Sequence, residues 1–181
     1  MKIKNISELY GTKWLAFKSA EFISKEGNVL KWDYVSRKGN RQVVTCICRS
    51  KKNRYLLISQ PRVPLNKTVI EFPAGLVDEG ESFETAALRE LKEETGYTGI
   101  VKRVIPPVCK SAGLTDETTA IVEIEVDENA VNKTEMEETE DIQSFWMAPT
   151  KIWDFIMNLD REKFIVDTLV TCYFLSYKNK K

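Results

Sequence analysis

Short apolar runs recur along the chain, separated by polar segments or by turns that contain glycine. Runs of this length that are rich in Val, Ile, Leu and aromatic residues are typical of β-strands. The run at 67–72 ends at Pro73, because proline cannot donate to a sheet ladder. We therefore expect strands over residues 14–23, 29–35, 42–48, 55–59, 67–72, 100–105, 118–126 and 142–147.

The clearest helical pattern covers residues 82–95. Ser82 is a preferred cap, residues 86–91 supply apolar packing positions, and Gly96 is suited to end the helix. Two further helices are expected over residues 149–158 and 161–177. Strands with interspersed helices predict an α/β or α+β sandwich.

The composition is that of an ordinary globular protein, with 181 residues of which 43% are hydrophobic and 30% are charged. The 27 basic and 27 acidic residues cancel, which argues against a nucleic-acid or membrane-surface partner. No apolar run approaches the length of a membrane span, and residues 1–11 lack the apolar core of a secretory signal. The four scattered cysteines do not resemble a disulfide framework, and Cys46 and Cys48 are expected to be core thiols. The cytoplasm is therefore the expected compartment.

The chain contains no histidine. This absence excludes a Ser-His-Asp triad, a Cys-His pair and any metal site with histidine ligands. Proton transfer near neutral pH would depend on carboxylates, Lys, Cys or Tyr with shifted pKa values. If the protein is an enzyme, acidic residues are the first candidates for its chemistry.

Three acidic residues gather on the predicted helix at 82–95. Glu90 and Glu94 are four positions apart and share one face, with Glu93 beside them. Like charges at this spacing repel, so the cluster suggests a compensating hard cation such as Mg²⁺ or Mn²⁺. The simpler interpretation is a solvated charged face, which is the more usual meaning of a bare E-x-x-E-E helix.

The residues around this cluster favour the first interpretation. The pattern G-x5-E-x7-R-E-U-x-E-E-x-G-U, where U is bulky and apolar or aromatic, is filled by Gly75, Glu81, Arg89, Glu90, Leu91, Glu93, Glu94, Gly96 and Tyr97. A chance match has a probability of about one in a million at average composition. The segment resembles the Nudix box, the signature of the Nudix hydrolases. Arg89 is expected to brace the loop before the helix by pairing with Glu81.

The resemblance implies an α/β/α sandwich with a mixed sheet. It also implies that Glu90 and Glu94 are metal ligands, that Glu93 belongs to the catalytic set beside them, and that the carbonyl oxygen of Ala74 is a further ligand. The implied cofactor is Mg²⁺, with Mn²⁺ as a substitute. Such a cation neutralises a diphosphate and lowers the pKa of a bound water.

Other segments resemble one branch of the family, the ADP-ribose or ADP-sugar pyrophosphatases. These segments are VIEFPAGLVDEGE at 69–81, PVCKSAGL at 107–114, QPR at 60–62 and KWD at 31–33. Members of this branch are typically homodimers whose amino-terminal strands cross to the partner. We therefore expect an N-terminal antiparallel strand extension over residues 1–40 and a hydrolase domain over 41–181. Ala112 is a departure, because the branch usually has a proline in this turn.

The branch resemblance also implies residues that bind the substrate. Trp32 and Trp14 would stack on adenine, since an indole ring offers a large flat face to a base. The alternative is that these tryptophans lie in a core or in a dimer interface. Arg62 would hold a phosphate, assisted by Arg37, although both are also compatible with ordinary surface arginines.

An acidic segment without periodicity covers residues 127–141. Enzymes of the resembled branch take a further metal ligand and a catalytic base from a loop after the box. By that resemblance Glu140 is a metal ligand and Glu138 is the base that accepts the proton of water. Glu137 or Asp141 could take either role, and a solvated loop is the alternative interpretation.

These residues predict a Mg²⁺-dependent enzyme that hydrolyses the diphosphate linkage of ADP-ribose, or of a related ADP-sugar, to AMP and a sugar phosphate. One alternative is a pyrophosphatase for another nucleoside diphosphate sugar or a dinucleotide. The other is a non-catalytic ligand-sensing or RNA-binding module, which the three intact box carboxylates and the neutral net charge disfavour.

Overall fold

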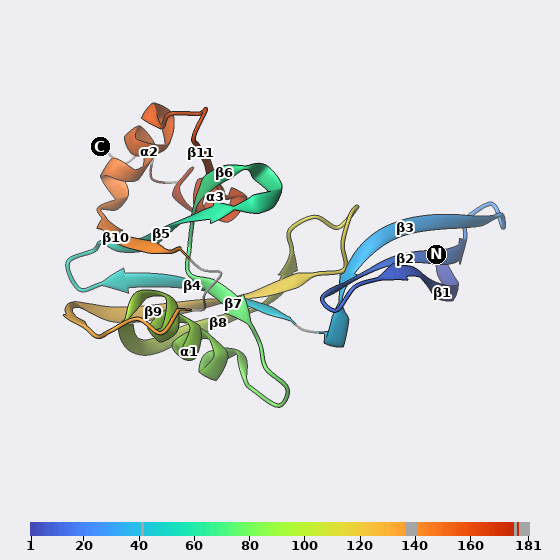
Figure 1. The fold of residues 1–181 in the computed structure, drawn as a ribbon, viewed down its shortest axis with the longest axis horizontal. Helices are drawn as coiled ribbons and strands as arrows, with labels where there is room; N and C mark the ends of the chain where they lie inside the picture. Colours follow the sequence, from blue (N-terminus) through green and yellow to red (C-terminus); the bar gives the residue numbers. More distant parts are fainter. Residues whose placement is uncertain (41, 137–140, 176, 178–181) are drawn as a thin grey trace.

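The computed structural model describes residues 1–40, 42–136, 141–175 and 177 (Figure 1). The strands are β1 (Lys2–Gly11), β2 (Leu15–Ile23), β3 (Val29–Arg37), β4 (Val43–Ser50), β5 (Tyr55–Arg62), β6 (Lys67–Glu71), β7 (Ala74–Leu76), β8 (Tyr97–Cys109), β9 (Thr118–Val131), β10 (Gln143–Met147) and β11 (Phe164–Val166). The α-helices are α1 (Phe83–Thr95), α2 (Pro149–Asn158) and α3 (Thr168–Leu175), and short 3-10 helices occupy Lys38–Asn40 and Val63–Leu65.

The described strands form two sheets. β1, β2 and β3 make an antiparallel sheet of their own, which we call the arm. The main sheet has the order β11-β6-β5-β4-β9-β8, with β10 paired to β5 and β7 paired to β4. It is mixed, because β4 runs parallel to β9 and β11 runs parallel to β6, whereas the other pairs are antiparallel.

Alternation along β4 separates two hydrophobic cores. Val44, Cys46 and Cys48 are fully buried in the core that also contains Ala86, Ala87 and Leu91 of α1. Ile47 belongs to the second core, with side chains of α2 and α3. Successive residues of a strand point to opposite faces, so one strand supplies both cores. The arrangement is an α/β/α sandwich, with α1 on one side and α2 and α3 on the other (Figure 1), which confirms the expected fold class.

Helix α1 begins and ends as its sequence predicts. The hydroxyl of Ser82 accepts a hydrogen bond from the Thr85 backbone N–H at 3.2 Å. Gly96 has a φ of 73°, a left-handed conformation that favours glycine, and its N–H donates to the carbonyl of Lys92. The helix buries Ala86, Ala87, Leu91, Glu94 and Thr95, so a carboxylate is part of its inward face.

The carboxyl-terminal helix is shorter than expected. Its predicted first part forms β11 instead, with Phe164–Val166 paired to Thr68–Ile70 of β6. Asp167 then caps α3, because its carboxylate accepts a hydrogen bond from the Leu169 N–H at 2.8 Å. A short apolar run is compatible with either a strand or a helix. Here the run forms a strand because it can pair with the edge of β6.

Two other strands were not expected from the sequence. Strand β1 is exposed at every position. It therefore has no buried face, and its sequence lacks the alternation of apolar and polar residues that would predict a strand. It forms because it pairs with β2 along its length. Strand β7 has only three residues, and its pairing with β4 brings Ala74 opposite Thr45.

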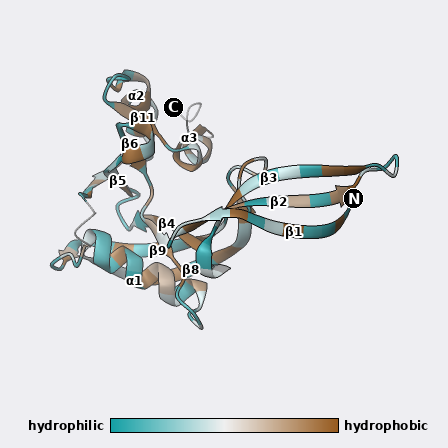
Figure 2. Cartoon of the chain, turned by 45° about the vertical axis from the view of Figure 1, so that its right-hand side comes forward, coloured by the Kyte–Doolittle hydropathy of each residue, from teal (hydrophilic) through white to brown (hydrophobic). Residues whose placement is uncertain are grey.

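The arm projects away from the main sheet (Figures 1 and 2). Large apolar side chains remain exposed on it, among them Trp14, Phe17, Val29, Leu30 and Trp32.

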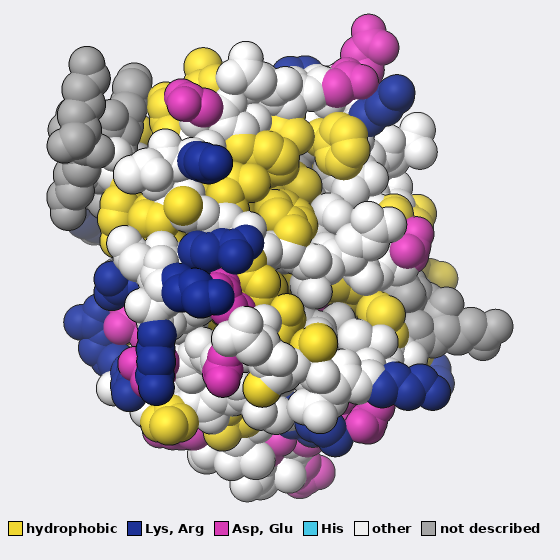
Figure 3. All heavy atoms as spheres, turned by 90° about the vertical axis from the view of Figure 1, so that its left-hand side faces the viewer, with side chains coloured by type: hydrophobic (Ala, Val, Ile, Leu, Met, Phe, Trp, Pro, Cys, Tyr) yellow, Lys and Arg dark blue, Asp and Glu magenta, His cyan; other side chains and the backbone are white. Residues whose placement is uncertain are grey.

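On the opposite side of the molecule, drawn in Figure 3, basic side chains are interspersed with acidic and apolar ones. No helix among the described residues has the length and apolar character needed to span a membrane.

Candidate active site

A cleft of about 600 Å³ lies where the box helix faces the ends of several strands. Its walls come from β3, β5, β6, β7, α1 and the segments that follow β8 and β11. The charged residues that line it are Arg37, Arg62, Glu71, Asp78, Arg89, Glu90, Glu93, Lys110, Glu117, Glu135 and Asp167. Residues far apart in the sequence therefore meet in one strongly charged cavity.

The α1 carboxylates are held against β7 by tight contacts. Glu94 is only 4% exposed, and one of its carboxylate oxygens accepts a hydrogen bond from the Ala74 backbone N–H at 3.1 Å. Glu90 lies so close to Gly75 that a β-carbon at position 75 would collide with the whole carboxylate group. Glycine at this position is required for the approach of Glu90 to the β7 backbone.

Arg89 organises the acidic residues around the helix, as expected from the sequence. Its guanidinium forms two hydrogen bonds to Glu81, at 3.1 and 2.9 Å, and donates to the carbonyl of Leu76 at 2.8 Å. It also contacts Glu90 at 2.9 Å and Glu93 at 3.0 Å. These hydrogen bonds raise the pKa of Arg89, with Glu81 as the largest cause, and lower the pKa of Glu81. The box loop is therefore fixed to the helix by charge-assisted bonds.

The donor atoms near β7 suit a hard divalent cation. Glu90, Glu93 and Glu94 supply carboxylate oxygens from adjacent turns of α1, and oxygen ligands are the ones that such cations prefer. Glu94 is held on the Ala74 backbone and Glu90 against Gly75, so two of the three carboxylates meet the same short strand. Among the described residues, no group of three or more acidic or cysteine side chains is already arranged to hold a metal ion.

The two arginines expected to bind phosphate lie in the same cleft as the helix carboxylates. Arg62 donates from Nε to Glu71 at 2.8 Å, and Arg37 forms an ion pair with Glu117. Both guanidinium groups are thus oriented by a carboxylate from a neighbouring segment. The structure brings together Ala74, Glu90, Glu93 and both arginines of the predicted set in the lining of the cleft. Glu94 is buried on the Ala74 N–H and is not itself among the lining residues.

The two tryptophans expected to bind adenine, unlike the two arginines, do not line the cleft. Trp14 and Trp32 are 66% and 54% exposed on the arm, and neither is among the described residues that line the cleft. The indole N–H of Trp32 donates to the carbonyl of Gly113 at 3.1 Å. The Lys13 ammonium lies 4.5 Å from the centroid of the Trp14 ring. Within one chain, the structure does not bring either ring to the helix carboxylates.

The segment 113–117 is fastened to β3 over several consecutive residues. Besides the Trp32 bond, the Val35 N–H donates to Leu114 at 2.8 Å, and the Ser36 hydroxyl donates to Asp116 at 2.9 Å. The pair of Arg37 and Glu117 continues the same contact into the cleft. We call this set of contacts the clasp. It joins the arm to a wall of the cleft.

Glu138 and Glu140, the predicted base and loop ligand, lie outside the described residues, as does Glu137. The described part of the acidic segment nearest to them is tied to α1. The Glu135 N–H donates to the carbonyl of Glu93 at 2.9 Å, and its carboxylate accepts from Lys92 at 2.8 Å. The part of the acidic segment that directly precedes Glu137 therefore approaches the end of α1 that carries the box carboxylates.

The charged residues of the cleft that were not identified from the sequence include Glu71, Lys110, Glu117 and Asp167. Glu71 carried a usable signal, because an acidic residue inside an apolar run is rarely buried without a partner. It is 8% exposed and paired with Arg62. The other three lie at strand or helix ends, where the local sequence does not reveal which neighbours they will meet.

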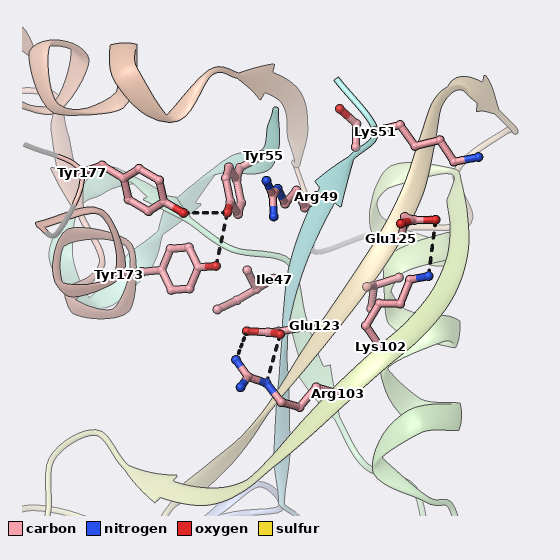
Figure 4. Close-up of a pocket in the computed structure, with 12 residues that line it drawn as sticks. Ile47, Arg49, Lys51, Tyr55, Lys102, Arg103, Glu123, Glu125, Tyr173 and Tyr177 are labelled. Carbon is pink, nitrogen blue, oxygen red and sulfur yellow. Dashed lines mark hydrogen bonds and ion pairs between the residues drawn. The ribbon is translucent and has the colours of Figure 1, made fainter. Parts of the chain in front are cut away.

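A second groove of about 620 Å³ lies between α3 and the strands β4, β8 and β9 (Figure 4). Its carboxylates are paired across strands, Glu123 with Arg103 at 2.7 Å and Glu125 with Lys102 at 3.4 Å. Three tyrosine hydroxyls meet at its other wall, where burial raises the pKa of Tyr55. Because its acids face basic partners instead of one another, this groove lacks the carboxylate cluster of the cleft.

Comparisons with known proteins agree with this geometry. The NUDIX domain family matches residues 39–167. The chain is 32% identical over 183 residues to the ADP-ribose pyrophosphatase of Saccharomyces cerevisiae, covering 94% of this chain and 79% of that protein. It is 37% identical over 122 residues to the ADP-sugar pyrophosphatase of Mus musculus, covering 63% and 56%. A crystal structure of an ADP compounds hydrolase aligns over 99% of this chain and 96% of that one, with a TM-score of 0.70 and 19% identity, which is a likeness of fold.

Proposed function

Because the chain belongs to the Nudix family, we propose that it hydrolyses the diphosphate linkage of ADP-ribose, or of a related ADP-sugar, to AMP and a sugar phosphate. The observation that carries this proposal is the cleft that Glu90 and Glu93 of α1 line together with Arg37 and Arg62. The names of the yeast and mouse relatives support the substrate class.

Mg²⁺, with Mn²⁺ as a substitute, is the proposed cofactor. The residues proposed to hold it are Glu90, Glu94, the carbonyl of Ala74 and Glu140. When bound, the cation would neutralise the diphosphate and lower the pKa of a water molecule. Glu94 is suited to its part because burial and the Ala74 N–H fix its carboxylate before any ligand arrives.

The other residues of the cleft have complementary roles in the proposal. Arg37 and Arg62 bind the diphosphate oxygens, with Glu117 and Glu71 holding each guanidinium in position. Glu93 acts beside the metal ligands, and Glu138 accepts the proton of the attacking water. A carboxylate takes the role of base because the chain has no histidine.

We further propose that the protein is a homodimer in which residues 1–40 act as a separate strand extension and the arm of one subunit completes the cleft of the other. The exposed apolar side chains of the arm support this arrangement, since a large exposed apolar patch usually marks an interaction surface. Trp14 and Trp32 would then stack on the adenine bound by the partner subunit.

The free cysteines agree with a cytoplasmic location.

Replacing Trp14 by Ala is expected to raise KM for ADP-ribose about tenfold with little change in kcat, because stacking of a base on an aromatic ring is worth about 1–3 kcal/mol. Steady-state kinetics of AMP release measure the effect. Trp14→Phe serves as the matched control, since it keeps an aromatic face. An unchanged KM in Trp14→Ala would show that this ring does not contact the adenine.

A substrate panel tests the proposed specificity. With Mg²⁺ and with Mn²⁺, ADP-ribose and ADP-sugars are expected to be cleaved at least about tenfold more efficiently than UDP-sugars, GDP-sugars or dinucleotides, a difference of about 1.4 kcal/mol in transition-state binding. Release of the nucleoside monophosphate is measured by chromatography. A preference for UDP- or GDP-sugars would replace the adenine-specific proposal with the alternative nucleoside diphosphate sugar pyrophosphatase.

A further inference from the structure

Lys110 and Asp167 face each other within the lining of the cleft. The Lys110 ammonium nitrogen lies 3.9 Å from one carboxylate oxygen of Asp167, and the two side chains are 35% and 22% exposed. This separation exceeds the roughly 2.7–3.2 Å of a direct hydrogen bond. The pair therefore holds a donor and an acceptor close together, with solvent access and without a direct bond between them.

Backbone contacts fix Asp167 in position. The Asp167 N–H donates to the carbonyl of Ile70 at 2.9 Å, and its other carboxylate oxygen accepts from the Leu169 N–H at 2.8 Å. Lys110 directly follows β8 and precedes a turn in which the Leu114 N–H donates to Ser111 at 2.9 Å. The oxygen that faces Lys110 is thus presented by a carboxylate already anchored through its other oxygen.

The spacing between the two groups suits a bridging hydroxyl group. An oxygen placed about 2.8 Å from both atoms would accept a hydrogen bond from Lys110 and donate one to Asp167. A hydroxyl can do both, whereas an ionised phosphate oxygen has no proton to donate and would be repelled by the carboxylate. The two arginines that line the cleft, Arg37 and Arg62, are the groups suited to phosphate.

We propose that Lys110 and Asp167 form a subsite that binds a hydroxyl group of the substrate's distal sugar and thereby selects nucleoside diphosphate sugars over nucleoside diphosphate esters that carry no distal sugar. This inference rests on the proposed function of the cleft. It adds a determinant of specificity that acts on the sugar, separate from the groups that act on the adenine and on the diphosphate.

The test compares two substrates, ADP-ribose and the ethyl ester of ADP on its terminal phosphate. Both are hydrolysed at the diphosphate, which releases AMP and either ribose 5-phosphate or ethyl phosphate, but the ester has no distal sugar and therefore no distal hydroxyl groups. Lys110→Met is expected to lower kcat/KM for ADP-ribose about tenfold or more, mainly through KM, because a hydrogen bond from a charged group is lost. Turnover of the ethyl ester is expected to change less than about twofold, since the ester makes no such bond.

Two further variants separate binding from folding. Asp167→Asn keeps an oxygen that can cap α3, and it is expected to show the same selective loss for ADP-ribose. Lys163→Met is the control, because Lys163 forms a comparable pair with Asp160 at 3.7 Å and is not among the described residues of the cleft. Its kinetics on both substrates are expected to match the wild type.

The outcomes distinguish this inference from the proposed function. If Lys110→Met slows both substrates equally, or neither, the sugar subsite is wrong while the pyrophosphatase proposal stands. If the wild-type protein releases no nucleoside monophosphate from any nucleoside diphosphate sugar, the proposed function fails and the subsite fails with it. A loss confined to ADP-ribose supports the subsite.

Discussion

Glu94→Gln is expected to lower the rate of AMP release from ADP-ribose by more than about a hundredfold in the presence of Mg²⁺. Substitution of residues that merely orient a metal ligand typically costs about 10–100-fold, and loss of a ligand charge should exceed that. Glutamine has the same shape and can still accept the hydrogen bond from the Ala74 N–H, so the fold should persist. The rate is measured by following AMP at saturating substrate.

Two measurements make this prediction specific. Glu84→Gln removes an exposed carboxylate from the first turn of the same helix and should leave the rate unchanged. Circular dichroism and thermal unfolding should show that Glu94→Gln remains folded. Undiminished turnover in a folded Glu94→Gln protein would contradict the assignment of this helix as the metal-binding element.

Gly75→Ala is expected to cause a comparable loss of activity without removing any functional group. The added methyl would overlap the carboxylate of Glu90, so this side chain must leave its position on β7. The atoms that the methyl meets are the end of a flexible side chain, so the midpoint of thermal unfolding should change little while activity drops about a hundredfold. Activity assays and calorimetry on the purified variant measure both effects.

Gly113→Ala provides the matched control for this substitution. No atom lies within 4 Å of a methyl group added at Gly113, and its carbonyl, which accepts the Trp32 bond, is retained. Its activity and stability should resemble those of the wild type. If Gly75→Ala behaved in the same way, the close approach of Glu90 to the backbone would not matter for catalysis.

The parts of the fold that the sequence predicts well depend on local signals. Helix α1 is capped at Ser82 and ends at Gly96. Each end of the helix is therefore determined by residues that lie next to it in the sequence. The alternation that buries Cys46 and Cys48 on one face of β4 is equally local. The bracing of the box by Arg89 follows from a spacing of eight residues to Glu81.

The parts that escaped prediction depend on partners far away in the chain. Strand β11 forms on the edge of β6, roughly a hundred residues earlier, and the apolar run alone favoured a helix. The cleft also pairs Arg37 with Glu117, which lies 80 positions later in the chain, through the clasp. No local pattern identifies such pairs, because they arise only once the sheets have assembled.

The clasp affects how far the chain could be shortened without losing part of the cleft. The region of similarity to the family begins at residue 39, but Arg37 lies in the cleft and β3 is bonded to residues 113–117. A chain shortened to the matched region would lose a cationic side chain of its own cleft along with the arm. We therefore expect the smallest active fragment of this protein to be larger than the segment by which its family is identified.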